Sequence, residues 1–307
     1  RSPGHWPGSH PHALSNVWLL NRSKGHVDAI RANGLVLVTP DGERRVRIQA
    51  TTLATEVGPV DLVIVLVKSF DTRDAILGAK SLIGARTLVL SLQNGLGHED
   101  ILSEVVGRDR VLAGKTYVGG VLLGPGRVSA GTAGKHTCIG ELDGDISDRV
   151  RSIASVFNEA GLVTSVSDNI RGTMWDKLMV NVATGALSGI TRLTYGELYK
   201  VPAVKSTALA AVAEALAVAR AAGVQLSITE PVQAWDRARE GLPADFKASM
   251  LQSLEKGSIT EIDFINGAVV NWGERLGVPT PVNAALVACI KGVEWALKAH
   301  QPVRECA

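Results

Sequence analysis

The sequence predicts an α/β domain followed by an all-helical domain, on two observations. Up to about residue 167, short apolar runs typical of buried strands alternate with amphipathic, helix-like segments. From about residue 168 onwards, strand-like runs give way to helical patterns. A chain of 307 residues is long enough for two ordinary domains. We therefore expect domains at residues 1–167 and 168–307.

The elements of the first half follow one another in a regular order. "VWLLN" is expected to be a strand, and the next segment a short helix that ends at Gly34. Leu62–Val67 is apolar on both faces, as expected of a parallel strand covered by helices. A helix over "DTRDAILGAKSLIG", with Asp71 as candidate N-cap, leads to a second buried strand ending in "SLQNGLG". Strand pairs with Gly and Pro turns, an amphipathic helix and a last strand complete this half.

The second half is expected to be helical throughout. Its candidate helices are "MWDKLMVNVATGALSGI", "VPAVKSTALAAVAEALAVARAAG", "ITEPVQAWDRARE", "ADFKASMLQSLEKG", "EIDFINGAVVNWGERLG" and "PVNAALVACIKGVEWALKAH". An α/β half followed by a helical half is a common plan for two-domain dehydrogenases. In such proteins the ligand lies at the carboxyl ends of the strands, in the cleft facing the second domain.

Composition excludes several classes of protein. Hydrophobic residues make up 46% and charged residues 20%, which argues against disorder, and a net charge of +2 argues against nucleic-acid or acidic-membrane partners. Three scattered cysteines fit a reducing compartment and argue against a disulfide framework or a zinc site. We find no metal-ligand cluster, no membrane-span-length apolar run and no apolar core of a signal peptide. A cytoplasmic protein with a small-molecule ligand is therefore expected.

Lys177 and Asn181, in "WDKLMVN", are candidates for chemistry. They are four residues apart, so a helix places them on one face, followed by small residues that would leave room for a ligand. An ammonium at this position can donate a proton or a charged hydrogen bond to a substrate oxygen. The alternative is an exposed helix lysine with a capping asparagine.

Lys68 and Asn94 each follow an apolar strand. The carboxyl ends of parallel strands are where ligands bind in open α/β sheets, which favours a role for both side chains. Asn94 precedes a glycine, and an Asn-Gly turn explains it equally well. The Lys68 side chain could instead simply extend to the rim of the fold.

Glu261 and Asp263 are expected to open a helix. Acidic residues in a first turn are explained by the helix dipole, and Thr260 could equally be the N-cap. The alternative is that Glu261 faces the cleft, meets Lys177 and orients the ammonium. Ser249, on the preceding helix, could bind a substrate carboxylate.

Arg22 follows the strand "VWLLN", where dinucleotide-binding domains contact the adenosine ribose. An arginine at this position accommodates the 2′-phosphate of NADP, whereas an acidic residue favours NAD. With Lys24 nearby, the sequence points to NADP, and the alternative is a plain basic loop.

The glycine-rich turn that should precede this strand is not recognisable. Such turns let backbone N–H groups face the pyrophosphate. Here the nearest glycines are Gly4 and Gly8, and no G-x-G precedes Val17. We expect the first strand and the glycine-rich turn to be missing or altered, so no glycine is included among the cofactor contacts.

Together, "VKSFDT", "LQNGLG", "WDKLMVN" and "SMLQSLEKGSITEIDFINGAVV" resemble the ketopantoate reductase (2-dehydropantoate 2-reductase) family, from about Val17 to Ala299. The resemblance implies a Rossmann-type NADP-binding domain at 1–167 and a helical substrate and dimerisation domain at 168–307. It also implies NADPH-dependent reduction of ketopantoate to pantoate in pantothenate biosynthesis. The apolar helical half is compatible with a homodimer.

The resemblance also implies roles for individual residues. Lys177 would be the catalytic acid that protonates the ketone oxygen, and Glu261 its carboxylate partner. The expected contacts are Asn94, Asn181 and Ser249 for the substrate, and Arg22, Lys68, Asn94 and Glu261 for the cofactor. No metal is required.

Three alternatives remain beside this function. Some family members have a second asparagine where this chain has Gly185, so a relative that reduces another 2-oxo acid is one of them. An inactive relative that has lost the pyrophosphate-binding turn is the second. The third is a 3-hydroxyacid or polyol-phosphate dehydrogenase with the same two-domain plan, against which "EIDFINGAVV" speaks.

Overall fold

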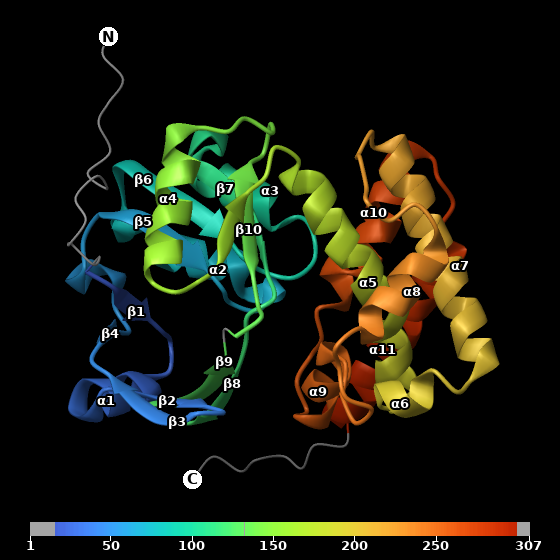
Figure 1. Ribbon diagram of the computed structural model, residues 1–307, viewed down its shortest axis with the longest axis horizontal. Coiled ribbons are helices and arrows are strands. Elements are labelled where there is room, and N and C mark those ends of the chain that lie inside the picture. Colours follow the sequence, from blue (N-terminus) through green and yellow to red (C-terminus); the bar gives the residue numbers. More distant parts are fainter. Residues whose placement is uncertain (1–15, 132, 300–307) are drawn as a thin grey trace. The chain divides into compact units, whose positions relative to one another are not determined.

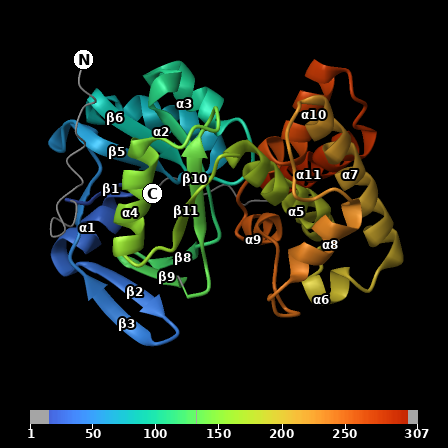
Figure 2. The same ribbon diagram turned by 45° about the horizontal axis from the view of Figure 1, so that its top comes forward.

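A computed structural model describes residues 16–131 and 133–299 (Figures 1 and 2). The expected α/β half followed by an all-helical half is confirmed. The stretch predicted to hold an altered glycine-rich turn falls in residues 1–15 and lies outside the described residues.

The chain divides into two compact units. The sheet unit holds the described residues up to Val67, then Asp71–Gln93 and His98–Ile170. The helical unit holds the described residues from Arg171 onwards, together with Lys68–Phe70 and Asn94–Gly97. Two short segments of the first half thus belong to the helical unit by their contacts, which a single boundary at 167/168 did not anticipate. The roles predicted for the two domains stay predictions.

The sheet unit is built around a five-stranded sheet in the order β11-β10-β7-β6-β5. Neighbouring strands β5, β6 and β7 run parallel, while β10 is antiparallel to β7 and parallel to β11. The bounds are β5 Val60–Val65, β6 Ile83–Ser91, β7 Val111–Thr116, β10 Thr137–Glu141 and β11 Thr164–Val166.

Helices cover both faces of this sheet. Residues of α4 (Asp148–Glu159) pack on one face, around Leu90 and Leu112 (Figure 1). Residues of α2 (Thr72–Gly78) and α3 (His98–Val106) pack on the other, around Val89. This double cover explains why the inner strands β6 and β7 carry apolar residues on both faces, whereas Ile64 of the edge strand β5 is exposed.

Two smaller sheets complete the sheet unit. Strand β1 (Trp18–Leu20) pairs in parallel with β4 (Gln49–Thr51), against which α1 (Lys24–Asn33) packs. The second is a four-stranded sheet in the order β3-β2-β9-β8 (Figure 2). Its bounds are β2 Leu35–Thr39, β3 Gly42–Val46, β8 Gly119–Gly124 and β9 Arg127–Gly131. Short 3₁₀ turns are η1 Ala54–Glu56, η2 Ser69–Asp71, η3 Lys80–Leu82 and η4 Arg108–Arg110.

The helix expected over "DTRDAILGAKSLIG" is shorter in the structure. It ends at Gly78, a 3₁₀ turn follows, and β6 begins at Ile83. The Asp71 carboxylate makes no capping hydrogen bond and pairs with Arg22 at 3.1 Å instead. The sequence predicted that the Asp71 side chain would cap this helix, but in the structure that side chain pairs with Arg22, which is distant in sequence.

The helical unit packs its long helices against one another. Helix α10 contacts α7 and α11, and α7 contacts α8. The bounds are α5 Ile170–Thr191, α6 Tyr195–Leu198, α7 Pro202–Ala221, α8 Pro231–Arg239, α9 Ser249–Glu255, α10 Asn266–Leu276 and α11 Pro281–Ala299. Helix α6 is a single turn and was not predicted.

Helix α7 is the one described helix that is long and apolar enough to cross a membrane by length and composition. Its contacts are those of a core helix. The Glu214 carboxylate accepts hydrogen bonds from the backbone N–H groups of Val282 and Asn283 at the start of α11. It therefore satisfies donors that have no partner within α11 itself.

Glu99 is a buried carboxyl in the first turn of α3, with 6% of the residue exposed. Burial raises the pKa of Glu99 to about 7, and the negative charge of Asp100 acts in the same direction. Hydrogen bonds from the backbone and from Ser91 oppose the shift without cancelling it. Glu99 is therefore partly protonated at neutral pH.

Glu99→Gln should flatten the pH dependence of stability. Because the folded state holds the Glu99 proton up to about pH 7, whereas the ordinary pKa is 4.5, stability falls as pH rises through that window. We expect the variant to be as stable as the parent at low pH and more stable above pH ~8, by about 3 kcal/mol. Urea unfolding across this range measures the difference. Parallel curves for the two proteins would contradict the prediction.

Candidate active site

The Glu261 carboxylate is the centre of the candidate site. The residue is 9% exposed and precedes the 3₁₀ turn η5 (Ile262–Phe264). Its Oε1 accepts hydrogen bonds from the Ser69 backbone N–H at 3.0 Å and from Ser69 Oγ at 2.5 Å. Its Oε2 lies 3.2 Å from Lys68 Nζ. These partners lie about 190 residues away in sequence, yet all belong to the helical unit.

The backbone around Glu261 differs from the single helix that the sequence predicted. Glu261 and Asp263 do not open α10, which begins at Asn266 after η5. Thr260 is not the cap of α10, but its Oγ1 accepts a hydrogen bond from Ile262 N. The apolar helical spacing continued across the 3₁₀ turn, so the pattern gave no sign of the break.

Lys68 and Asn94 lie in the loops that follow β5 and β6, close to their predicted places after the strands. The strand expected over Leu62–Val67 ends at Val65, and Ile64, Leu66 and Val67 are exposed, so the prediction of a run buried on both faces was wrong. Ser69 Oγ lies 3.4 Å from the Asn94 carbonyl oxygen, so Asn94 joins the group around Glu261 through its backbone. The following residue, Gly95, has a φ of +94°, and a Cβ there would lie 2.4 Å from Phe264 O. The loop after β6 can thus pack closely on η5 because residue 95 is glycine.

Lys177 and Asn181 share one face of α5, as their spacing predicted, and both are partly exposed. The small residues further along do not leave the expected room for a ligand. Thr184 Oγ1 is 2.9 Å from Tyr195 Oη, and a Cβ at Gly185 would lie 3.4 Å from Met250 Cε. These positions are small because they pack inside the helical unit.

Several of the predicted contacts stay predictions. The side chains that bind the Glu261 carboxylate are Lys68 and Ser69, and its meeting with Lys177 stays a prediction. Ser249 is exposed at the start of α9, and the next residue, Met250, is buried. The side-chain roles of Asn94, Asn181 and Ser249 therefore stay predictions.

Sequence reasoning missed Ser69. Its backbone and hydroxyl make two of the hydrogen bonds to Glu261. It directly follows Lys68 at the end of a strand, the same position that singled out its neighbour. The position of Ser69 could therefore have indicated a role, but serine is common in loops and carries no charge, so the residue itself gave no reason to select it.

Arg22 lies in the sheet unit, just after β1. Its side chain is 83% exposed and pairs with Asp71 at 3.1 Å. Such an exposed pair is worth little energy, so the guanidinium stays available to another anion. The position after a parallel strand is the one from which dinucleotide-binding domains contact the ribose.

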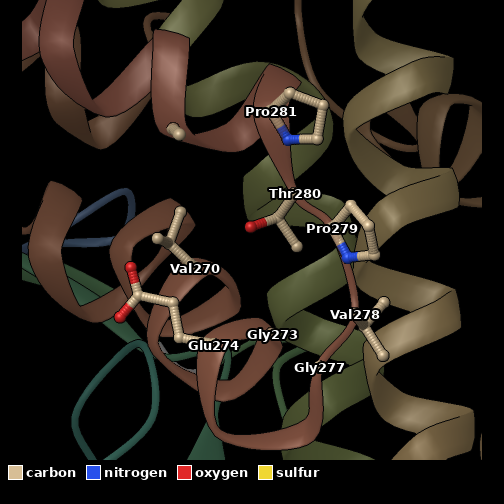
Figure 3. A pocket seen from close by; sticks show the side chains of 9 residues that line it. Val270, Gly273, Glu274, Gly277, Val278, Pro279, Thr280 and Pro281 are labelled. Carbon is tan, nitrogen blue, oxygen red and sulfur yellow. The ribbon is translucent and has the colours of Figure 1, made fainter.

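Figure 3 shows a pocket where α10 ends and α11 begins. It is lined by Val270, Gly273, Glu274, Gly277, Val278, Pro279, Thr280, Pro281 and Ala284. One carboxylate and one hydroxyl among apolar groups do not form a convergent polar set. Within residues 16–131 and 133–299, no group of three or more His, Cys, Asp or Glu side chains could hold a metal ion.

Comparison with known proteins identifies the family. The family model described as ketopantoate reductase PanE/ApbA matches residues 10–144, and the model of its C-terminal domain matches residues 169–294. A 2-dehydropantoate 2-reductase of Halobacterium salinarum is 35% identical over 90% of both chains. That of Pyrococcus horikoshii is 34% identical over 91% of this chain and 90% of its own.

Solved structures agree. A PanE/ApbA family ketopantoate reductase from Ralstonia eutropha superimposes with a TM-score of 0.84 at 35% identity, over 95% of this chain and 93% of that chain. D-mandelate dehydrogenase, solved with NADH and anilino(oxo)acetate, has a TM-score of 0.85 at 29% identity, over 92% of both chains. The chain therefore belongs to the ketopantoate reductase (2-dehydropantoate 2-reductase) family of NAD(P)-dependent oxidoreductases.

Proposed function

We propose that this protein reduces ketopantoate to pantoate with NADPH, using Lys177 as the general acid. The observation that carries the proposal is the buried Glu261 carboxylate, held by Lys68 and Ser69 in a chain whose relatives are named 2-dehydropantoate 2-reductase. Burying a carboxylate is unfavourable unless donors compensate it, and here the Ser69 N–H, the Ser69 hydroxyl and the Lys68 ammonium do so. Its neighbours come from loops that follow two parallel strands, where ligands bind in such sheets.

The chemistry required is modest. NADPH, when bound, supplies the hydride that attacks the ketone carbon. Charge then develops on the ketone oxygen, and the Lys177 ammonium stabilises it and donates the proton. Glu261 orients the ammonium and accepts a hydrogen bond from a substrate hydroxyl. Asn94, Asn181 and Ser249 provide the uncharged polar groups for the substrate.

The residues near β1 and β5 suit the cofactor. The exposed Arg22 guanidinium matches a 2′-phosphate, and the half-exposed Lys68 ammonium, already beside Glu261, can serve a second polar group. Both are cations, as expected for a dinucleotide carrying several phosphate charges. The cytoplasmic location and the homodimer stay predictions.

The test is an NADPH oxidation assay with the 307-residue chain. We expect ketopantoate to be turned over with a higher kcat/KM than other 2-oxo acids. Turnover of a different 2-oxo acid with ketopantoate rejected would keep the reaction class and overturn the substrate.

A second candidate is a reductase of another 2-oxo acid. The likeness to D-mandelate dehydrogenase favours it, as does Gly185, where Met250 fills the space beside α5. A panel that includes branched and aromatic 2-oxo acids, assayed with NADPH and with NADH, separates the two candidates. A preference for an aromatic 2-oxo acid and NADH would support this second one.

A binding measurement tests whether the chain is an inactive relative. We expect NADPH to bind the 307-residue chain with a micromolar dissociation constant, measured by the enhancement of nicotinamide fluorescence. Absence of binding would support the inactive relative and contradict the proposed function.

Arg22→Ala should weaken the preference for NADPH over NADH. Because the guanidinium is expected to bind the 2′-phosphate, which NADH lacks, the KM for NADPH should rise ~10-fold or more while that for NADH changes little. Arg108→Ala removes another exposed arginine of the sheet unit and serves as the control. An equal rise in both KM values would show that Arg22 does not read the 2′-phosphate.

A further inference from the structure

Glu294 is a buried carboxylate on α11, with 7% of the residue exposed. Its Oε1 accepts two hydrogen bonds from Thr260, one from the backbone N–H and one from Oγ1, both at 2.7 Å. Short bonds to an ionised acceptor are among the stronger hydrogen bonds in proteins. One oxygen atom of α11 therefore fixes the residue that directly precedes Glu261.

The same bonds also reach the residue after Glu261. Thr260 Oγ1, while donating to Glu294, accepts from the Ile262 backbone N–H at 3.2 Å. Glu261 is thus flanked on both sides by backbone that depends on Glu294. The Glu261 carboxylate itself accepts its hydrogen bonds from Ser69.

A second contact from α11 holds the same segment. Lys291 Nζ lies 2.5 Å from Asp263 Oδ2 and 3.5 Å from Glu294 Oε2. Partial burial disfavours the charged lysine, but its hydrogen bonds to Asp263 and Glu294 and their negative charges outweigh burial and raise the pKa of Lys291. The ammonium therefore stays charged and ties Asp263 to Glu294.

We propose that Glu294 is a positioning residue for the reaction: through Thr260, it holds the backbone that aims the Glu261 carboxylate at Lys68 and Ser69. Burying a carboxylate is expensive, and a simple helix contact does not require one. A displacement of about 1 Å in a catalytic group can lower activity ~100-fold. Holding the backbone around Glu261 in place would therefore matter for turnover. The inference rests on the proposed function for its effect on turnover, but not for its effect on structure.

The first arm of the test is amide hydrogen exchange followed by mass spectrometry, which does not depend on activity. In Glu294→Ala we expect faster exchange in two separate segments, residues 259–264 and residues 67–71, because the Ser69 N–H loses a fixed acceptor. Peptides of α8, elsewhere in the helical unit, should be unchanged. Glu274→Ala, which removes an exposed carboxylate of α10, is the matched control.

A Gln substitution separates the acceptor oxygen from the charge. Glu294→Gln keeps an Oε1 that can accept both Thr260 bonds. Its NH₂ replaces the oxygen that lies 3.5 Å from Lys291 Nζ, but Lys291 keeps its shorter ion pair with Asp263. Exchange in residues 67–71 should therefore stay close to that of the parent. Unchanged exchange at residues 67–71 in Glu294→Ala would overturn the proposal, as would a Gln variant that behaves like the Ala variant.

The second arm measures kinetic coupling with NADPH and ketopantoate. Glu294→Ala should lower kcat ~10-fold or more, and Glu294→Gln should restore it to within ~3-fold of the parent. In a Glu261→Gln background, Glu294→Ala should have little further effect, because the group that it positions is already changed. Additive losses in this cycle would show a general structural role and overturn the positioning role.

The two arms fail independently. A parent protein that reduces no 2-oxo acid would contradict the proposed function, and the exchange arm would still decide whether Glu294 fixes the Glu261 turn.

Discussion

Lys177→Met should abolish most of the activity, lowering kcat with ketopantoate and NADPH by ~10²–10⁴-fold. Methionine keeps the length and apolar stem of lysine but can neither donate a proton nor stabilise charge on the ketone oxygen. Because Lys177 lies on the partly exposed face of α5, the substitution should leave the thermal midpoint nearly unchanged. The loss of activity would then come from the missing proton donor and not from unfolding.

Two further variants sharpen this result. Lys177→Arg keeps a positive charge but offers a planar fork instead of a compact ammonium, and a poor acid, so only a small part of the activity should return. Lys205→Met removes an exposed lysine of α7 and should behave like the parent. If Lys177→Met retained more than about a tenth of the parental kcat, the proton would have to come from elsewhere.

Glu261→Gln should lower kcat/KM by ~100-fold with little loss of stability. The glutamine Oε1 can still accept the two bonds from Ser69, but its NH₂ would face the Lys68 ammonium, two donors with no acceptor between them. Lys68 should therefore move, and with it the contact that we assign to the cofactor.

Glu261→Ala should add a loss of stability, because the buried Ser69 N–H and hydroxyl lose their acceptor. We expect about 1–3 kcal/mol less free energy of unfolding than for Glu261→Gln. Urea unfolding and steady-state kinetics on both variants separate the two effects. Equal stability of Ala and Gln variants would show that Ser69 finds another partner, and full activity of the Gln variant would contradict the role of Glu261.

Much of the fold was predictable because it is written in local patterns. Apolar runs without alternation gave β5 and β6, and helical spacing gave α5, α7 and α11 with their approximate bounds. The spacing of Lys177 and Asn181 fixed their shared face for the same reason. Strand ends located Lys68 and Asn94, because the position of a residue after a buried strand is itself a local signal.

What the sequence missed depends on contacts between distant segments. The two donors from Ser69 to Glu261 and the two from Thr260 to Glu294 join residues 192 and 34 positions apart. No periodicity records such pairs. Gly185 was misread for the same reason, since the Met250 side chain that fills its space comes from another helix. The type of a residue and its neighbours in the sequence could not show which distant residues it contacts.

The most direct test of the central claim follows the hydride itself. NADPH carrying deuterium at both C4 positions of the nicotinamide is incubated with ketopantoate and the 307-residue chain, and the product is analysed by mass spectrometry. We predict pantoate with one deuterium at C2, formed by the parent and formed at least ~100-fold more slowly by Lys177→Met. Pantoate without deuterium, or no pantoate at any enzyme concentration, would contradict the claim.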